Sequence, residues 1–306
     1  MTTFDESLHP RGQAANSGQF REKRNDAPAG ALTAVLPEMT PADVRNADYT
    51  IDVLREHITA TEGVHDLHVS GTDEDGNVIL EWKTHSRYSG DHVFEDRVRV
   101  DESGEIVAVE SGRGGQWFNQ DPHGDELAAY RMKVNEVRLA HAGVYVHGQP
   151  NDGGPYGRKF VGGRVDQESR WRDAAQVSKD IRQQIKSATE WGALPSDLAY
   201  AVRTNKYAGG QSIDITVEGM SDADQYTERQ DGFPHGRSGR AKEITEVLEI
   251  IGNQWNTDES DVMTDYFNVT YYCFVRIDDE RMAAFRAEQR AIAARKRADK
   301  KAKAAA

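Results

Sequence analysis

The sequence predicts an α+β protein with two small domains, each an antiparallel sheet with helices packed on it, plus a flexible N-terminal leader and a basic C-terminal helix. Segments with alternating apolar residues indicate strands, and apolar residues three and four positions apart indicate helices. A chain of 306 residues is typical of about two domains. Because only 37% of the residues are apolar, two small cores are easier to fill than one large core.

Residues 1–38 are predicted to form a disordered leader. They are rich in glycine, proline, asparagine, glutamine and small residues, and they show no regular apolar period. The alternative is a short recognition peptide anchored on His9–Gly12 and Gly18–Arg21.

Residues 39–145 are predicted to form an acidic domain built on a meander of four strands. Thr40 and Pro41 mark a helix start, because threonine caps helices and proline is favoured in the first turn. A helix near residues 124–140 closes the domain, and the glycine-rich residues 146–170 are predicted to be a linker or a long surface loop. The apolar pattern is carried by Ile51, Leu54, Ile58, Leu67, Val69, Val78, Leu80, Trp82, Val98, Val100, Ile106 and Val109.

Residues 171–277 are predicted to form a second domain with the order helix, strand, strand, helix, strand. The first helix carries the stripe Ala174, Val177, Ile181, Ile185 and Ala188. The second strand points Ile213, Ile215 and Val217 inward, and the second helix buries Ile244, Val247, Leu248, Ile251 and Trp255. The last strand, with Phe267 to Ile277 alternating, is long enough to suggest a central strand paired on both sides. Residues 219–238 are predicted to be a mobile excursion.

The charge is unevenly distributed along the chain. The formal net charge is −13, and residues 41–130 hold twenty acidic but only seven basic residues. Residues 290–306 hold seven basic residues and one acidic residue. The acidic part should repel nucleic-acid phosphates, whereas residues 278–306, predicted to be a solvent-exposed basic helix, should attract them.

The compartment is predicted to be the cytoplasm. Cys273 is the only cysteine, so no disulfide forms within the chain. The first residues lack the apolar core of a secretion signal, and no run approaches the ~20 apolar residues that cross a bilayer. We therefore expect no membrane partner, and the sequence leaves the oligomeric state open.

The second domain resembles a known family. The residues that carry the likeness are Lys179–Arg182, Val202–Thr204, the hairpin Tyr207–Ile213, the loop Asn256–Asp261 and the strand entry Thr264–Phe267. In these motifs the segment is similar to a large polyvalent protein-associated domain, of the type numbered twenty-nine, over about a third of the chain. The resemblance implies a protein of a phage, plasmid or other mobile genetic element, and it brings no catalytic residues.

Three groups of side chains are candidates for binding. Arg203, Lys206 and Tyr207 lie on or beside the predicted hairpin tip, where basic and aromatic residues can follow a nucleic-acid backbone. In the last strand, Tyr266 and Tyr272 should face away from Phe267 and Tyr271, and an exposed aromatic face is a binding surface. The remaining candidates are Asp265 beside that strand and Arg295, Lys296 and Arg297 in the tail.

No cofactor or metal site is predicted. His65 and His68 should point to opposite faces of a strand, so they do not form a ligand pair. Asp258–Asp265 is a dense acidic loop for which capping and turn chemistry, a divalent ion or a partner contact are the alternatives. The glycine clusters at 112–115 and 153–157 lack the context of a phosphate loop.

These observations predict a non-enzymatic accessory or interaction protein of a mobile element. It would bind nucleic acid or a DNA-processing protein through the hairpin and the tail. One alternative is an antirestriction-like inhibitor whose outward carboxylates in residues 41–130 imitate DNA. The other is a metal-dependent hydrolase or nuclease with an ion at the acidic loop.

Overall fold

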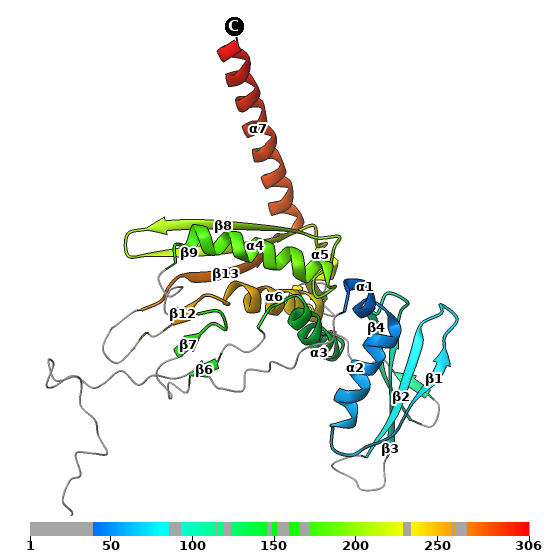
Figure 1. Ribbon diagram of the computed structural model, residues 1–306. Coiled ribbons are helices and arrows are strands. Elements are labelled where there is room, and N and C mark those ends of the chain that lie inside the picture. The colour runs from blue at the N-terminus through cyan, green and yellow to red at the C-terminus, as the bar shows by residue number, and fades with distance from the viewer. Residues whose placement is uncertain are drawn as a thin grey trace, which may run out of the picture. The chain divides into compact units, whose positions relative to one another are not determined.

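We describe the protein from a computed structural model (Figure 1). The structure describes residues 39–85, 93–113, 116–118, 124–145, 149–151, 159–165, 172–228, 234–258, 260 and 268–305. Met39–Ala306 form one compact unit. The predicted leader at 1–38 lies outside the described residues.

The first half of the chain builds a five-stranded antiparallel sheet in the order β1-β2-β3-β4-β5. The strands are β1 (Val64–Thr72), β2 (Val78–His85), β3 (Val93–Val100), β4 (Ile106–Arg113) and β5 (Gln116–Phe118). The predicted four-stranded meander is confirmed, and β5 extends it. The short helix α1 (Pro41–Val44) has Thr40 as its N-cap and proline at its first position, as the sequence predicts.

One face of this sheet is covered by helices α2 (Ala47–Thr59) and α3 (Asp125–His141). Asn46 separates α1 from α2 and caps α2, because its side chain accepts a hydrogen bond from the Tyr49 N–H. The buried core contains Ala47, Ile51, Leu54, Ile58, Leu80, Trp82, Val98, Val100, Ile106, Val109 and Val134. Val69 was expected in this core but is 42% exposed, although it pairs with the buried Leu80, and it lies on the edge strand β1.

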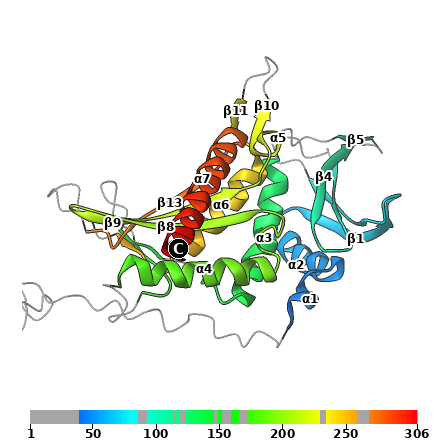
Figure 2. The ribbon, with the colours of Figure 1, turned by 90° about the horizontal axis from the view of Figure 1, so that it is seen from above.

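The second half builds a three-stranded sheet in the order β13-β9-β8. Its strands are β8 (Ala199–Tyr207), β9 (Gly210–Glu218) and β13 (Tyr272–Ile277). Helices α4 (Ala174–Glu190) and α6 (Gly239–Gly252) pack on it, and Figure 2 shows α4 running alongside the β8–β9 hairpin. All the predicted apolar residues of both helices are buried, which confirms their stripes.

Two expectations about this sheet are wrong. It is mixed rather than antiparallel, because β13 pairs with β9 in parallel. The chain leaves β9 and returns through α6, and a helical crossover brings the next strand back in the same direction. Among the described residues β13 pairs only with β9, so it is a six-residue edge strand, and β9 is the central strand.

Short elements occupy segments that the sequence suggested were irregular. Within 146–170, β6 (Gln149–Asn151) and β7 (Lys159–Val161) form a small sheet with β12 (Thr257–Asp258). Within 219–238, α5 (Asp222–Gln225) is followed by the paired strands β10 (Tyr226–Glu228) and β11 (Pro234–Arg237). These segments are too short to show a period, so the sequence pattern did not reveal them.

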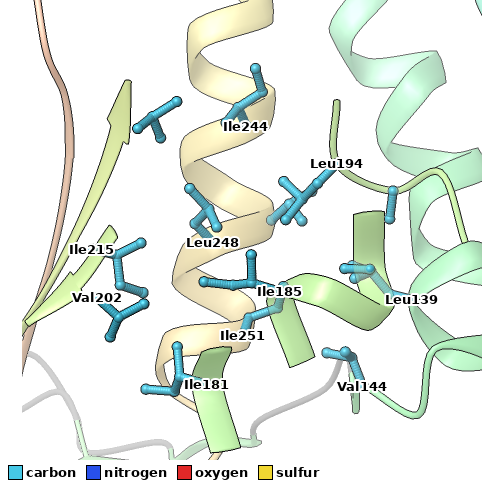
Figure 3. Packing of buried hydrophobic residues seen from close by; sticks show 14 of the residues in the cluster. Leu139, Val144, Ile181, Ile185, Leu194, Val202, Ile215, Ile244, Leu248 and Ile251 are labelled. Atoms are coloured by element: carbon cyan, nitrogen blue, oxygen red, sulfur yellow. The ribbon is translucent and has the colours of Figure 1, made fainter. Parts of the chain in front are cut away.

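Helix α3 belongs to both hydrophobic cores. Its Val134 packs in the first core, whereas Met132 and Leu139 pack in the second. Figure 3 shows Leu139 and Val144 meeting side chains of α4 and α6, including Ile185 and Ile251. The two sheets are therefore joined through one shared helix.

The C-terminal segment forms helix α7 (Glu280–Ala305). Asp279 caps its start, because its Oδ1 accepts a hydrogen bond from the Met282 N–H at 2.6 Å. Within the described part of the chain, no helix is both long and apolar enough to cross a membrane.

Candidate functional site

The three-stranded sheet leaves one face uncovered by α4 and α6. Side chains alternate along a strand, so the residues between the buried Ile213, Ile215 and Val217 point to this second face. The strand register places their neighbours on β8 and β13 beside them. We call this surface the open face, and it comprises Ala201, Arg203, Asn205, Tyr207, Ser212, Asp214, Thr216, Glu218, Tyr272, Phe274 and Arg276.

Two aromatic rings stand side by side on the open face. Tyr272 and Phe274 are 40% and 45% exposed, and their ring centroids lie 6.3 Å apart with planes inclined by only 10°. The Arg276 guanidinium carbon lies 5.9 Å from the Phe274 ring centre, within cation–π range. These side chains form an exposed, stacked aromatic pair with a positive charge beside it.

The centre of the open face is a polar row across the three strands. Arg203, Asp214 and Phe274 are direct neighbours in the register. Asp214 Oδ1 accepts a hydrogen bond from Arg276 Nη2 at 2.7 Å, and its Oδ2 accepts one from Asn205 Nδ2. Asp214 therefore orients Arg276, whose side chain is still 60% exposed.

The far end of β9 anchors the start of α7. Glu218 accepts a hydrogen bond from Arg290 and lies 4.0 Å from Arg286 Nη1. The hydrogen bond with Arg290 is the main reason that the pKa of Glu218 is lowered. Arg286 also lies 3.0 Å from the Asp278 carboxylate. The open face and the adjacent start of α7 thus carry four arginines near the carboxylates of Asp214 and Glu218. These arginines are Arg203, Arg276, Arg286 and Arg290.

The predicted binding residues are only partly brought together. Arg203, Tyr207 and Tyr272 share the open face, and the burial of Tyr271 confirms its alternation with Tyr272. Lys206 has the opposite orientation, toward α4, where it donates to Asp173 at 2.5 Å.

The other predicted residues lie elsewhere. Asp265 and Tyr266 lie outside the described residues. Arg295, Lys296 and Arg297 are exposed on α7.

Sequence reasoning missed Phe274, Arg276 and Asp214. The same period of two that selected Tyr272 would have selected Phe274 and Arg276. Asp214 was predicted to point outward, which is correct, but its pairing with Arg276 depends on the parallel register and is not readable from the sequence.

The first sheet also has a polar face, which we call the outer face: Ile79, Glu81, Lys83, Glu95, Arg97, Arg99, Ala108, Glu110, Gly112 and Trp117. Its arginines are held by carboxylates. Arg97 donates to Glu110 at 2.8 Å and stacks 4.0 Å from the Trp117 ring centre, and Arg99 donates to Asp73 at 3.2 Å. The carboxylates of Glu110 on this face and Asp73 beside it are paired with arginines, which interrupts an acidic track.

Several ionisable groups converge beneath the surface, where α3 meets α6. Glu243 is buried and accepts a hydrogen bond from Asn135 at 2.9 Å, with Arg131 at 3.8 Å. Burial raises the pKa of Glu243, although Arg131 opposes the shift. Hollows of about 200 and 120 Å³ are lined by other residues. Glu243 and Arg131 therefore connect α6 to α3, and they do not line either hollow.

Arg138 in the same region ties four segments together. Its guanidinium donates to the carbonyls of Gly104 at 2.9 Å and Gly192 at 3.1 Å, and to the Thr50 hydroxyl at 3.4 Å. Burial lowers the pKa of Arg138, the strongest opposing effect being the Glu105 carboxylate. These contacts fix α2, the β3–β4 turn and the end of α4 against α3.

The described residues contain no group of three or more histidine, cysteine or acidic side chains that could hold a metal ion. Asp258 Oδ1 accepts a hydrogen bond from the Ser260 N–H at 3.0 Å, a contact typical of turns. Asp261–Asp265 lie outside the described residues. His65 and His68 were expected on opposite faces, which is wrong. A bulge at Asp66, with φ of 56°, pairs them with Lys83 and Glu81 on one face.

Comparison of the chain with family models, with curated proteins and with solved structures found no match. The candidate site therefore stands on the geometry and charge of its own residues.

Proposed function

We propose that the protein binds single-stranded nucleic acid on the open face. The observation that carries this proposal is the exposed, nearly parallel pair Tyr272 and Phe274 with Arg276 beside it. Exposed rings on a sheet stack with unpaired bases, and each stacked base contributes roughly 1–3 kcal/mol. Neighbouring arginines supply charge for the phosphates.

The same features favour a single strand over a duplex. In a duplex the base faces are stacked on each other and are not available to Tyr272 and Phe274, whereas unpaired bases can be splayed out onto aromatic side chains. Stacking is tolerant of sequence because every base has an aromatic face. The expected ligand is therefore a strand chosen by its exposed bases rather than by a specific sequence.

The finer predictions from the sequence are part of this proposal. It includes an accessory, non-enzymatic role in a mobile genetic element and a second domain similar to the large polyvalent protein-associated domain. Two small domains that share α3, with a leader and a basic tail, are consistent with a binding platform. The DNA-mimicking inhibitor is less favoured, because carboxylates such as Glu110 and Asp73 on or beside the outer face pair with arginines. The metal-dependent hydrolase remains a prediction for the loop 258–265.

The test is fluorescence anisotropy of labelled eight-nucleotide DNA and RNA strands, and of the corresponding DNA duplex, at low salt. The variant with Tyr272→Ala and Phe274→Ala should bind the single strands at least tenfold more weakly than the wild-type protein, because two stacking contacts are lost. The matched control is Tyr145→Ala, which removes an aromatic ring that is 54% exposed but lies off the open face.

Undiminished strand binding by the folded double variant would overturn the proposal. So would an absence of strand binding by the wild-type protein. Saturable binding of a DNA-processing protein without any strand binding would instead assign the open face to a protein partner.

A further inference from the structure

We infer that a strand bound on the open face continues onto α7, so that the ligand is a single strand of more than four nucleotides. This inference rests on the proposed function and adds the length of the ligand and a second contact region. It is carried by the position of α7 relative to β9 and by the exposed cations that follow along the helix.

The open face and α7 are connected by ion pairs. Asp214, in the row of Phe274, and Glu218, which holds Arg286 and Arg290, lie on the same strand. Four residues of β-strand span about 13 Å. A strand stacked on Phe274 therefore has to extend roughly this distance to reach the beginning of α7.

The exposed cations continue beyond that contact. Arg290 is 55% exposed even though it pairs with Glu218, and Arg295, Lys296 and Arg297 are exposed further along the helix. Seven helical residues from Arg290 to Arg297 rise about 10 Å. Because the chain as a whole is acidic, this run of like charges is a local exception that suits a polyanion.

These distances set a minimum length for the ligand. Two nucleotides stack on Tyr272 and Phe274, and the path of ~23 Å from Asp214 to Arg297 needs several more. A strand of four nucleotides can occupy the open face but cannot also reach Arg295 and Arg297.

The test compares strands of four and sixteen nucleotides bound by the full chain. In the variant with Arg295→Gln and Arg297→Gln, affinity for the sixteen-nucleotide strand should fall about tenfold at low salt, and the slope of log affinity against log salt should decrease by about 1.4. Affinity for the four-nucleotide strand should stay unchanged. The charge-matched control, Lys179→Gln with Lys186→Gln, neutralises two exposed cations on α4 and should affect neither strand.

The outcomes separate the two proposals. If neither strand binds, the proposed function fails and this inference fails with it. If both strands bind but the α7 variant has equal effects on both lengths, or no effect on either, only the present inference is overturned. If the variant leaves strand affinity unchanged but abolishes a salt-sensitive self-association in sedimentation, then α7 contacts a second copy of the chain and the inference is also wrong.

Discussion

The outer face of the five-stranded sheet and the open face of β8, β9 and β13 are built on the same plan, with packed helices and an apolar core on one side and polar side chains on the other. They differ in how their arginines and aromatic rings are used. On the outer face, Arg97 packs over the Trp117 ring and donates a hydrogen bond to Glu110. The ring and the cation therefore already have partners within the protein. On the open face, Tyr272 and Phe274 stack on each other and leave their outward surface exposed. Under the proposed function, exposed rings beside oriented cations, rather than polarity alone, distinguish the open face from the outer face.

The largest expected effect tests whether the two regions fold as one unit. Leu80 and Ile215 are both fully buried, one in each core. Leu80→Ala and Ile215→Ala should each lower the free energy of unfolding by about 2–5 kcal/mol, through lost burial and a residual cavity. Because α3 belongs to both cores, urea unfolding followed by circular dichroism should shift as one transition in both variants. A second transition that stays at the wild-type midpoint would show that the cores unfold independently. Val107→Ala, at an exposed position, is the control.

A slightly smaller effect tests the joint between the regions. Arg138→Met should lower the free energy of unfolding by about 3 kcal/mol, because it removes the donor to the Gly192 carbonyl and leaves the Gly104 carbonyl with the Thr50 hydroxyl alone. Arg55→Met on α2, where the arginine is 47% exposed and pairs with Asp52, should change stability little. Equal thermal midpoints for the two variants would contradict the role of Arg138 as the joint.

The pH dependence of stability tests the buried Glu243 carboxyl, which lies near Arg138. The pKa of Glu243 is raised in the folded protein, mainly by burial, with Arg131 and Arg240 opposing and Glu105 reinforcing the shift. The folded state therefore holds this proton at pH values where the unfolded chain has released it. The contribution of Glu243 is most favourable below its ordinary pKa of 4.5 and is lost as pH rises through the folded pKa.

Glu243→Gln removes this titration. The stability of the wild-type protein relative to the variant should fall as the pH rises, as measured by urea unfolding at several pH values. A difference that is constant with pH, or that grows with pH, would contradict the raised pKa.

The smallest expected effect compares one arginine from each face. Arg276→Gln should weaken binding of a single strand about threefold at low salt, which is the contribution of roughly one phosphate contact. Arg97→Gln should leave this affinity unchanged, because Arg97 is only 20% exposed and already pairs with Glu110. Anisotropy titrations measure both variants, and an equal loss of affinity in the two would remove the distinction between the faces.

Much of this fold could be predicted from the sequence, because its apolar periods are clean. Leu80, Trp82 and the α4 stripe from Ala174 to Ala188 are buried as expected, and Val78 is partly buried against the same core as Leu80. The edge position and parallel direction of β13 could not be predicted, since both depend on how α6 returns the chain to the sheet. The bulge at Asp66 was equally hidden, because one extra residue in a strand reverses the alternation without leaving a pattern in the sequence.

The candidate site was predicted in part for a similar reason. Tyr272 and Arg203 were found from strand alternation and turn position. Phe274 and Arg276 follow from the same alternation but gain their meaning only from Asp214, which the register brings beside them. Arg138 and Glu243 are charged residues inside α-helices, where the sequence suggests solvent. Glu243 is interior because α3 packs against α6, and Arg138 is interior because α2, the β3–β4 turn and the end of α4 surround it.

The shared helix α3 limits how this chain can be divided. A fragment that ends before Asp125 would keep the first sheet but strip Val134 from beneath it. A fragment that starts after His141 would strip Leu139 from the second. Either cut would expose an apolar surface on the piece that lost the helix. Each piece therefore needs its own copy of residues 125–141 to remain in solution. Genetic shuffling of either half into another protein would meet the same restriction.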